Sequence, residues 1–251
     1  MSDRWRVVSA SVAGTSHEKR GQPCQDANCW ELLPEEMLVA AVADGAGSAS
    51  MGNVGADIAV GAAVETISKH KADLVADDEA WYDLMLDALK AARLAIEAES
   101  VMQELEPREF ATTLILVVAT PEMVTAAQVG DGAAVVGDRE DRIFPLTVPQ
   151  RGEHINETTF LISENALEEA QVKVWRGKPA HLAIFSDGLQ MLALKMPIGL
   201  PHDPFFIPLF KFVAEVTDGE EAREELESFL RSPRVTKRAD DDLTLLLARF
   251  D

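Results

Sequence analysis

Apolar side chains recur every three or four residues in several stretches of the chain, a spacing that places them on one face of a helix. The clearest cases are residues 50–69 and 81–101, and shorter ones lie at 188–194, 204–217 and 220–230. Stripes of this kind are typical of packing against a core, so we assign them no function.

Shorter apolar runs, separated by Pro, Gly and Asp, predict β-strands. They lie at residues 5–12, 30–33, 37–42, 112–119, 123–129, 133–137, 142–146, 172–175, 182–186 and 243–250, with a hairpin turn at 34–36. The order along the chain is strands, two helices, many strands, helices and a last strand. Because this order lacks regular β-α-β alternation, we expect an α+β fold with antiparallel sheets, in a single domain spanning residues 1–251.

Aspartates stand beside the ends of five apolar runs. Asp44, Asp131 and Asp187 each follow such a run, whereas Asp26 and Asp241 each precede one. If these strand ends converge, the carboxylates repel one another unless protons or hard cations lie between them. A ligand set made only of carboxylates favours magnesium or manganese over zinc or copper. The pattern therefore indicates a magnesium or manganese enzyme.

Two other interpretations of the same residues stay open. Asp-Gly is a strong signal for a tight turn, and we expect Asp218-Gly219 to form one between two helices. The second is a dinucleotide-binding loop, because residues 45–50 read Gly-x-Gly-x-x-Ser after a strand, with Glu65 about twenty residues on. Asp44 would then face the pyrophosphate, and the repeated strand–helix units of such folds are missing from the pattern. Both features disfavour the dinucleotide interpretation.

Charge and length narrow the possible partners. The 251 residues carry a net charge of −20, from 43 acidic and 23 basic side chains, which disfavours nucleic acids and anionic membranes. The longest uncharged apolar run, 110–121, is too short to span a bilayer, and the N-terminus does not resemble a signal peptide. Cys24 and Cys29 are too few for a disulfide framework. We expect a cytoplasmic protein with free thiols, a single Cys24–Cys29 bridge being the alternative.

Six short motifs, in order, resemble those of the metal-dependent Ser/Thr protein phosphatases, the PPM or type 2C family. They are QPCQDA at 22–27, VADGAG at 42–47, ATT at 111–113, VGDG at 129–132, FSDG at 185–188 and DDLT at 241–244. Each motif is weak by itself, but together they cover almost the whole chain. The pattern is most similar to short, stand-alone bacterial members.

The resemblance implies a sandwich of two antiparallel sheets flanked by helices, with a two-metal site at one edge. Asp44 would bridge two Mn²⁺ or Mg²⁺ ions, and the carbonyl of Gly45 would bind one of them. Asp187 and Asp241 would hold the other ion. Asp131, with Asp187, would offer a weaker third site.

The resemblance also implies hydrolysis of phosphoserine and phosphothreonine in proteins by a metal-bridged hydroxide, without a phosphoenzyme. Asp26 would orient the water. Family members often have a histidine, a proposed general acid, where this chain has Ala46, and a phosphate-binding arginine where it has Gly21. Arg20 and His17 are candidate phosphate contacts, the alternative being solvated loop residues.

These departures keep a second function open, that of a phosphoprotein-binding scaffold with little or no catalysis. The family resemblance implies phosphoprotein substrates and a cognate Ser/Thr kinase. Two polar or proline-rich segments, 149–158 and 196–208, are candidate flaps over the site. The basic run 231–238 could attract phosphoproteins, although most such runs are simply solvated.

Overall fold

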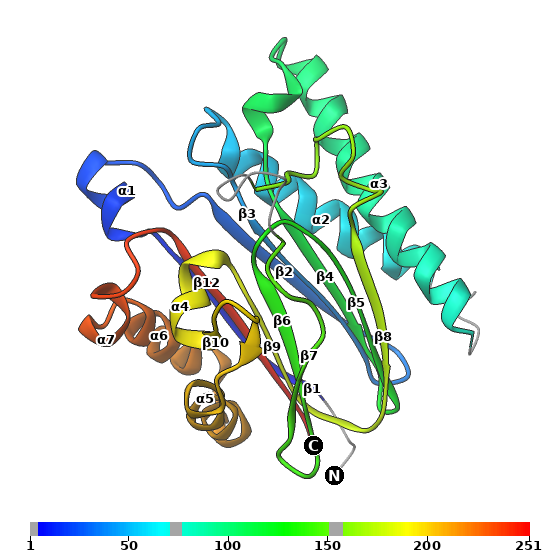
Figure 1. The fold of residues 1–251 in the computed structure, drawn as a ribbon, viewed down its shortest axis with the longest axis vertical. Helices are drawn as coiled ribbons and strands as arrows, with labels where there is room; N and C mark the ends of the chain where they lie inside the picture. The colour runs from blue at the N-terminus through cyan, green and yellow to red at the C-terminus, as the bar shows by residue number, and fades with distance from the viewer. Residues whose placement is uncertain (1–4, 71–76, 151–157) are drawn as a thin grey trace.

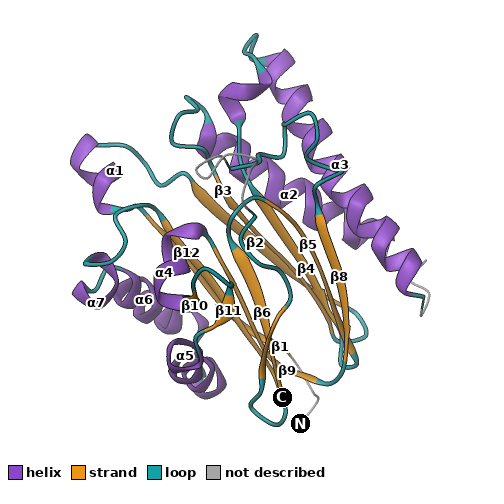
Figure 2. Ribbon diagram, in the orientation of Figure 1, coloured by secondary structure: helices purple, strands orange, loops and turns teal. Residues whose placement is uncertain are grey.

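The computed structural model describes residues 5–70, 77–150 and 158–251, and its centre is a pair of stacked antiparallel sheets (Figures 1 and 2). The first sheet, called here the β1 sheet, has the order β1 (Trp5–Val12), β12 (Leu243–Phe250), β9 (Pro179–Phe185), β6 (Ala133–Asp138) and β7 (Ile143–Pro145). The second, the β2 sheet, has the order β2 (Asp26–Leu33), β3 (Met37–Asp44), β4 (Leu114–Ala119), β5 (Met123–Val129) and β8 (Gln171–Arg176).

Helices cover the outer face of each sheet (Figure 2). The long helices α2 (Gly52–His70) and α3 (Asp78–Met102) pack on the β2 sheet. The β1 sheet is covered by α4 (Gln190–Ala193), α5 (Asp203–Glu215), α6 (Gly219–Leu230) and α7 (Pro233–Thr236). None of the helices in the described ranges has both the length and the apolar composition needed to cross a membrane.

The sandwich explains why so many strands are apolar at every position. Along β3, Leu38, Ala40 and Val42 pack between the two sheets, whereas Val39 and Ala41 pack against the helices. All five side chains are buried. A strand with both faces covered cannot show the alternating pattern of a solvent-facing sheet. The α+β sandwich with flanking helices that we expected is confirmed.

Several short elements differ from the sequence-based expectation. Strand β2 begins at Asp26 rather than at residue 30, because its first residues pair with the end of β3. The short helix expected at 188–194 is present as the 3₁₀ turn η3 (Asp187–Leu189) followed by α4. Four other elements were not predicted: helix α1 (Thr15–Arg20), the 3₁₀ turn η2 (Pro107–Phe110), the hairpin β10 (Leu194–Lys195)–β11 (Leu200–Pro201), and α7. Asp218 does not form the expected turn: its carboxylate accepts hydrogen bonds from the Glu220 and Glu221 amides and caps α6.

Of the two segments expected to be flaps, one is described in the structure and the other largely is not. Residues 196–208 run from the β10–β11 hairpin into the first turns of α5. Residues 149–158 fall largely outside the described residues.

Within the described part of the chain every strand pair is antiparallel, so α2 does not connect two parallel strands. In the described ranges there is therefore no parallel β-α-β unit of the kind that a dinucleotide-binding loop requires.

Candidate active site

Strand register brings all five predicted aspartates to one end of the sandwich. In the β2 sheet, Asp26 and Asp44 are direct partners at the start of β2 and the end of β3. In the β1 sheet, the end of β9 is level with the starts of β12 and β6. Asp187 follows β9, Asp241 precedes β12, and Asp131 precedes β6. The three loops from the β1 sheet therefore meet the paired aspartates of the β2 sheet.

A buried hydroxyl joins the two sheets at this end. Ser186 Oγ donates a hydrogen bond to Asp26 Oδ2 (2.7 Å) and accepts one from the Thr244 amide (2.9 Å). All three residues are buried. Because Ser186 follows β9 and Thr244 lies on β12, this bridge holds the Asp26 carboxylate in a fixed position relative to the β1 sheet. Sequence reasoning missed Ser186, although it stands directly before Asp187 in the FSDG motif.

The carboxylates resist ionisation in this environment. Burial raises the pKa of Asp26 to about 7, and the hydrogen bond from Ser186 offsets part of that effect. Burial, followed by the charges of Asp26 and Asp187, raises the pKa of Asp44 well above its usual range. Burial, followed by the charge of Asp131, raises the pKa of Asp187 to about 6. The group therefore holds several negative charges only if cations or protons accompany them.

The donor set fits a hard divalent cation. Asp26 Oδ1 and Asp187 Oδ1 are buried, and neither has a hydrogen-bond partner among the described residues. Buried carboxylate oxygens without partners are rare and costly in native proteins. Oxygen-only donors suit Mg²⁺ or Mn²⁺. The two unpaired oxygens are thus the structural sign that a cation, or water held beside one, could lie between these side chains.

The backbone at Asp44 is held by the ATT motif. The Asp44 carbonyl accepts hydrogen bonds from the Thr113 amide (2.8 Å) and Thr112 Oγ1 (2.9 Å), and the Asp44 amide donates to Thr113 Oγ1 (3.0 Å). A Cβ on Gly45 would lie 2.4 Å from the backbone of Gly52 at the start of α2. Glycine is therefore required here for close backbone approach.

The tight-turn interpretation of the Asp-Gly pairs is wrong at this site. Gly45, Gly132 and Gly188 all lie outside the positive-φ region that such turns use. At Gly132 and Gly188, as at Gly45, an added Cβ would come within 2.6 Å of a backbone atom of another segment. These glycines let neighbouring chains pass close to the aspartates that precede them.

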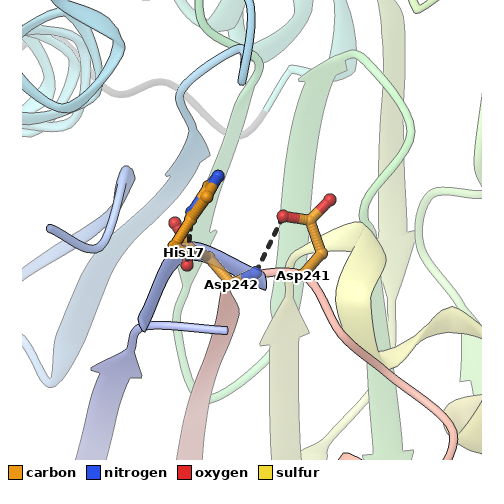
Figure 3. Close-up of side chains that lie close together, drawn as sticks. All are labelled: His17, Asp241 and Asp242. Carbon is orange, nitrogen blue, oxygen red and sulfur yellow. Dashed lines mark hydrogen bonds and ion pairs between the residues drawn. The ribbon is translucent and has the colours of Figure 1, made fainter. Parts of the chain in front are cut away.

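Beside Asp241 lies a second aspartate whose role the sequence did not reveal (Figure 3). Asp242 is buried, and its carboxylate accepts hydrogen bonds from the amides of Gly14 (2.7 Å) and Gln25 (2.6 Å). His17 Nδ1 lies 2.9 Å from Asp242 Oδ1. Asp241 is exposed, and its Oδ1 accepts a hydrogen bond from the Asp242 amide (2.9 Å). Asp242 therefore ties both ends of the α1 loop to the start of β12.

The two candidate phosphate contacts differ in exposure. His17 is buried and in contact with Asp242, so it is not a solvated loop residue. Three possible ligand atoms lie within 4.8 Å of one another, one each from His17, Asp241 and Asp242. They are close enough to share an ion. Arg20 is exposed at the end of α1.

The fifth aspartate, Asp131, is held by a side chain from another segment. Thr158 Oγ1 donates a hydrogen bond to Asp131 Oδ2 (2.6 Å).

Comparison with known proteins agrees with this geometry. The family profile described as Protein phosphatase 2C matches residues 13–231. Serine/threonine-protein phosphatase 3 of Escherichia coli (strain K12) is 38% identical over 252 residues, which cover 97% of this chain and 98% of the relative.

Solved structures show the same fold at low sequence identity. The S. agalactiae serine/threonine phosphatase superposes with a TM-score of 0.69 at 14% identity, covering 98% of this chain and 100% of that one. The catalytic domain of the phosphatase PstP, described in complex with two manganese ions, has a TM-score of 0.66 at 15% identity and covers 99% of both chains. With its six motifs in order and its α-β-β-α sandwich, the chain belongs to the protein phosphatase 2C family of metal-dependent phosphatases.

Proposed function

We propose that this chain hydrolyses phosphoserine and phosphothreonine in proteins with the help of two divalent cations, Mn²⁺ or Mg²⁺. The observation that supports it most directly is the pair of buried, unpartnered oxygens on Asp26 and Asp187. Family membership and the 38% identical relative named as a phosphatase support the reaction. The manganese-bound PstP domain motivates a count of two ions.

In this proposal the ligands come from both sheets. Asp44 and the carbonyl of Gly45 would hold one ion, and Asp44 would share the other with Asp187 and Asp241. Asp131, with Asp187, would provide a weaker third site. Bound ions would lower the pKa of water and neutralise the charge of the phosphoryl group.

The side chains of the chain itself would position the reactants. The Ser186 hydroxyl fixes one oxygen of Asp26 and leaves Oδ1 free to accept a hydrogen bond from the attacking water. The threonine pair of the ATT motif fixes the orientation of Asp44. His17 and Arg20 are proposed to contact phosphate. Because the histidine position of other family members is Ala46 here, we propose that the leaving alkoxide receives its proton from water.

The substrates would be phosphoproteins made by a cognate Ser/Thr kinase, and the site of action would be the cytoplasm. The net charge of −20 repels the phosphate backbone of nucleic acids and so favours proteins as substrates.

The test is hydrolysis of a phosphothreonine peptide with Mn²⁺, with Mg²⁺ and with EDTA. Asp44→Asn and Asp187→Asn should each lower kcat/KM by roughly a hundredfold or more, because each removes a metal ligand. Asp87→Asn, an exposed change on α3, removes the same charge far from the site and should leave the rate unchanged. Unchanged activity in EDTA would contradict the proposal. Tight phosphopeptide binding without turnover in any metal would indicate the scaffold function instead.

A further inference from the structure

A patch of unpaired positive charge lies on this acidic protein. Residues 231–238 contain four basic side chains and no acidic one, although acidic residues outnumber basic ones 43 to 23 in the whole chain. Arg231 is paired with Glu18 (2.7 Å). Arg234, Lys237 and Arg238 are exposed, and none of them has an ion-pair partner among the described residues. Their charges are therefore available to a ligand.

The arginines border two adjoining apolar hollows on the outer face of α5, α6 and α7. One hollow, of about 410 Å³, lies between α5 and α6 beside α7, and the other, of about 320 Å³, lies among α4, α5, α6 and α7. They share Phe205, Phe229 and Arg234, and the smaller one is also lined by Leu192 and Arg238. We call this surface the α5–α7 groove and define it by these five residues.

The groove presents half-buried apolar side chains at the surface. Phe205 and Phe229 are half-buried, with ring centroids 6.4 Å apart, so each keeps a free surface for a ligand. Leu192 is also half-buried. One acidic side chain, Glu225, lines the larger hollow. In the smaller hollow the charged side chains are both arginines, so an apolar group bound there would have positive charge beside it.

The groove lies close to the candidate active site along the chain. Arg238 precedes Asp241 by three residues, and Leu192 follows Asp187 by five. Even a fully extended chain would separate these pairs by no more than about 11 Å and 18 Å. Figure 1 shows α4 beside the first part of β12, and α7 joined by a short loop to the start of that strand, which Asp241 precedes. A peptide of a few residues could therefore reach from one site to the other.

We propose that the α5–α7 groove binds a segment of the phosphoprotein substrate in which an apolar side chain stands among acidic residues, a few residues from the phosphorylated one. This inference rests on the proposed function. The apolar side chain would enter the hollow beside Phe205 and Phe229, and Arg234 and Arg238 would contact the flanking carboxylates. Local positive charge is what an acidic segment needs in order to approach a protein of net charge −20.

The experiment compares two phosphothreonine peptides that differ only in the residues around a leucine, which are Asp and Glu in one and Lys in the other. In the wild type the acidic peptide should have the higher kcat/KM. We compare kcat/KM for the acidic peptide, divided by kcat/KM for the lysine peptide. The double variant Arg234→Glu/Arg238→Glu should lower this ratio about tenfold, mainly by raising the KM of the acidic peptide. The preference of the wild type should also shrink at high salt, because exposed charges are screened.

A matched control carries the same change in net charge at the opposite end of the sandwich. Arg139→Glu/Lys178→Glu alters two exposed residues, in the loops after β6 and before β9, and should leave the ratio unchanged. An acidic peptide whose leucine is replaced by glycine should lose the preference in the wild type. Both variants change exposed side chains, so the fold should persist, and circular dichroism would verify it.

Three results would overturn the inference. An unchanged ratio in the Arg234/Arg238 variant would show that the groove does not select substrates. An equal fall in the control would show that only net charge matters. A wild-type dimer that the Arg234/Arg238 variant dissociates would show that a second copy occupies the groove. Binding of the unphosphorylated acidic peptide, measured by fluorescence anisotropy, tests the groove even if the chain proves to have no phosphatase activity.

Discussion

The buried carboxyl of Asp26 should make the metal-free protein less stable as the pH rises. In the folded protein its pKa is raised to about 7 from 3.8, the ordinary value. The folded state therefore binds more protons than the unfolded state between these two values. The contribution to stability is complete below about pH 4 and is lost as the pH rises through 7. A pKa difference of about 3 corresponds to about 4 kcal/mol.

Asp26→Asn isolates this effect. The amide oxygen can still accept the hydrogen bond from Ser186, but the side chain no longer titrates. Without divalent cations, we expect the variant to be more stable than the wild type by about 2–4 kcal/mol at pH 8 and nearly equal to it near pH 3.5. Urea denaturation followed by circular dichroism, after removal of metals by a chelator, measures both values.

A matched variant excludes a general effect of net charge. Asp83→Asn, an exposed change on α3, removes one carboxylate without altering the site and should follow the pH dependence of the wild type. Saturating Mn²⁺ should stabilise the wild type more than Asp26→Asn, because the metal binds the folded state with the carboxylate ionised. If Asp26→Asn is no more stable than the wild type at pH 8 without metal, then the carboxylate is not desolvated as the structure indicates.

Three further changes test the packing around the site. Ser186→Ala removes the hydroxyl that bridges Asp26 and Thr244, and should cost about 1–3 kcal/mol because a buried amide loses its partner; a loss below about 0.5 kcal/mol in urea denaturation would contradict the bridge. Gly45→Ala should lower both stability and phosphatase activity, since its Cβ would lie 2.4 Å from the backbone at the start of α2. Gly61→Ala, within α2 and with open space around its Cβ, should instead raise stability by about 0.5–1 kcal/mol, and a lower melting temperature would refute that reasoning.

The local pattern was informative for long segments that bury either a run of apolar side chains or one periodic apolar stripe. The predicted strand at 123–129 has the same bounds as β5, because Pro121 and Gly130 lie close to the two ends of a mostly apolar run. The helices predicted at 50–69 and 81–101 correspond to α2 and α3 within a few residues, since each buries one apolar stripe. Long periodic or continuous apolar patterns survive in the fold because burial of those side chains is what stabilises it.

Short polar segments were not predictable in the same way. Residues 26–29 have little strand propensity and become the first part of β2 only because they pair with the end of β3. Helix α1 has six residues and no side-chain cap at its start, too little local signal to be recognised. Both depend on contacts with distant parts of the chain rather than on their own composition.

The order of apolar and turn residues was enough to locate the buried segments and five aspartates beside strand ends. Which carboxylates are buried, paired or free depends on the folded structure. Asp241 and Asp242 are chemically identical neighbours, yet one is exposed and the other accepts the amide of Gln25, 217 residues away. Asp26 is positioned by Ser186 across 160 residues. Burial and hydrogen-bond partners are properties of the folded neighbourhood, and that neighbourhood forms only when both sheets have packed together.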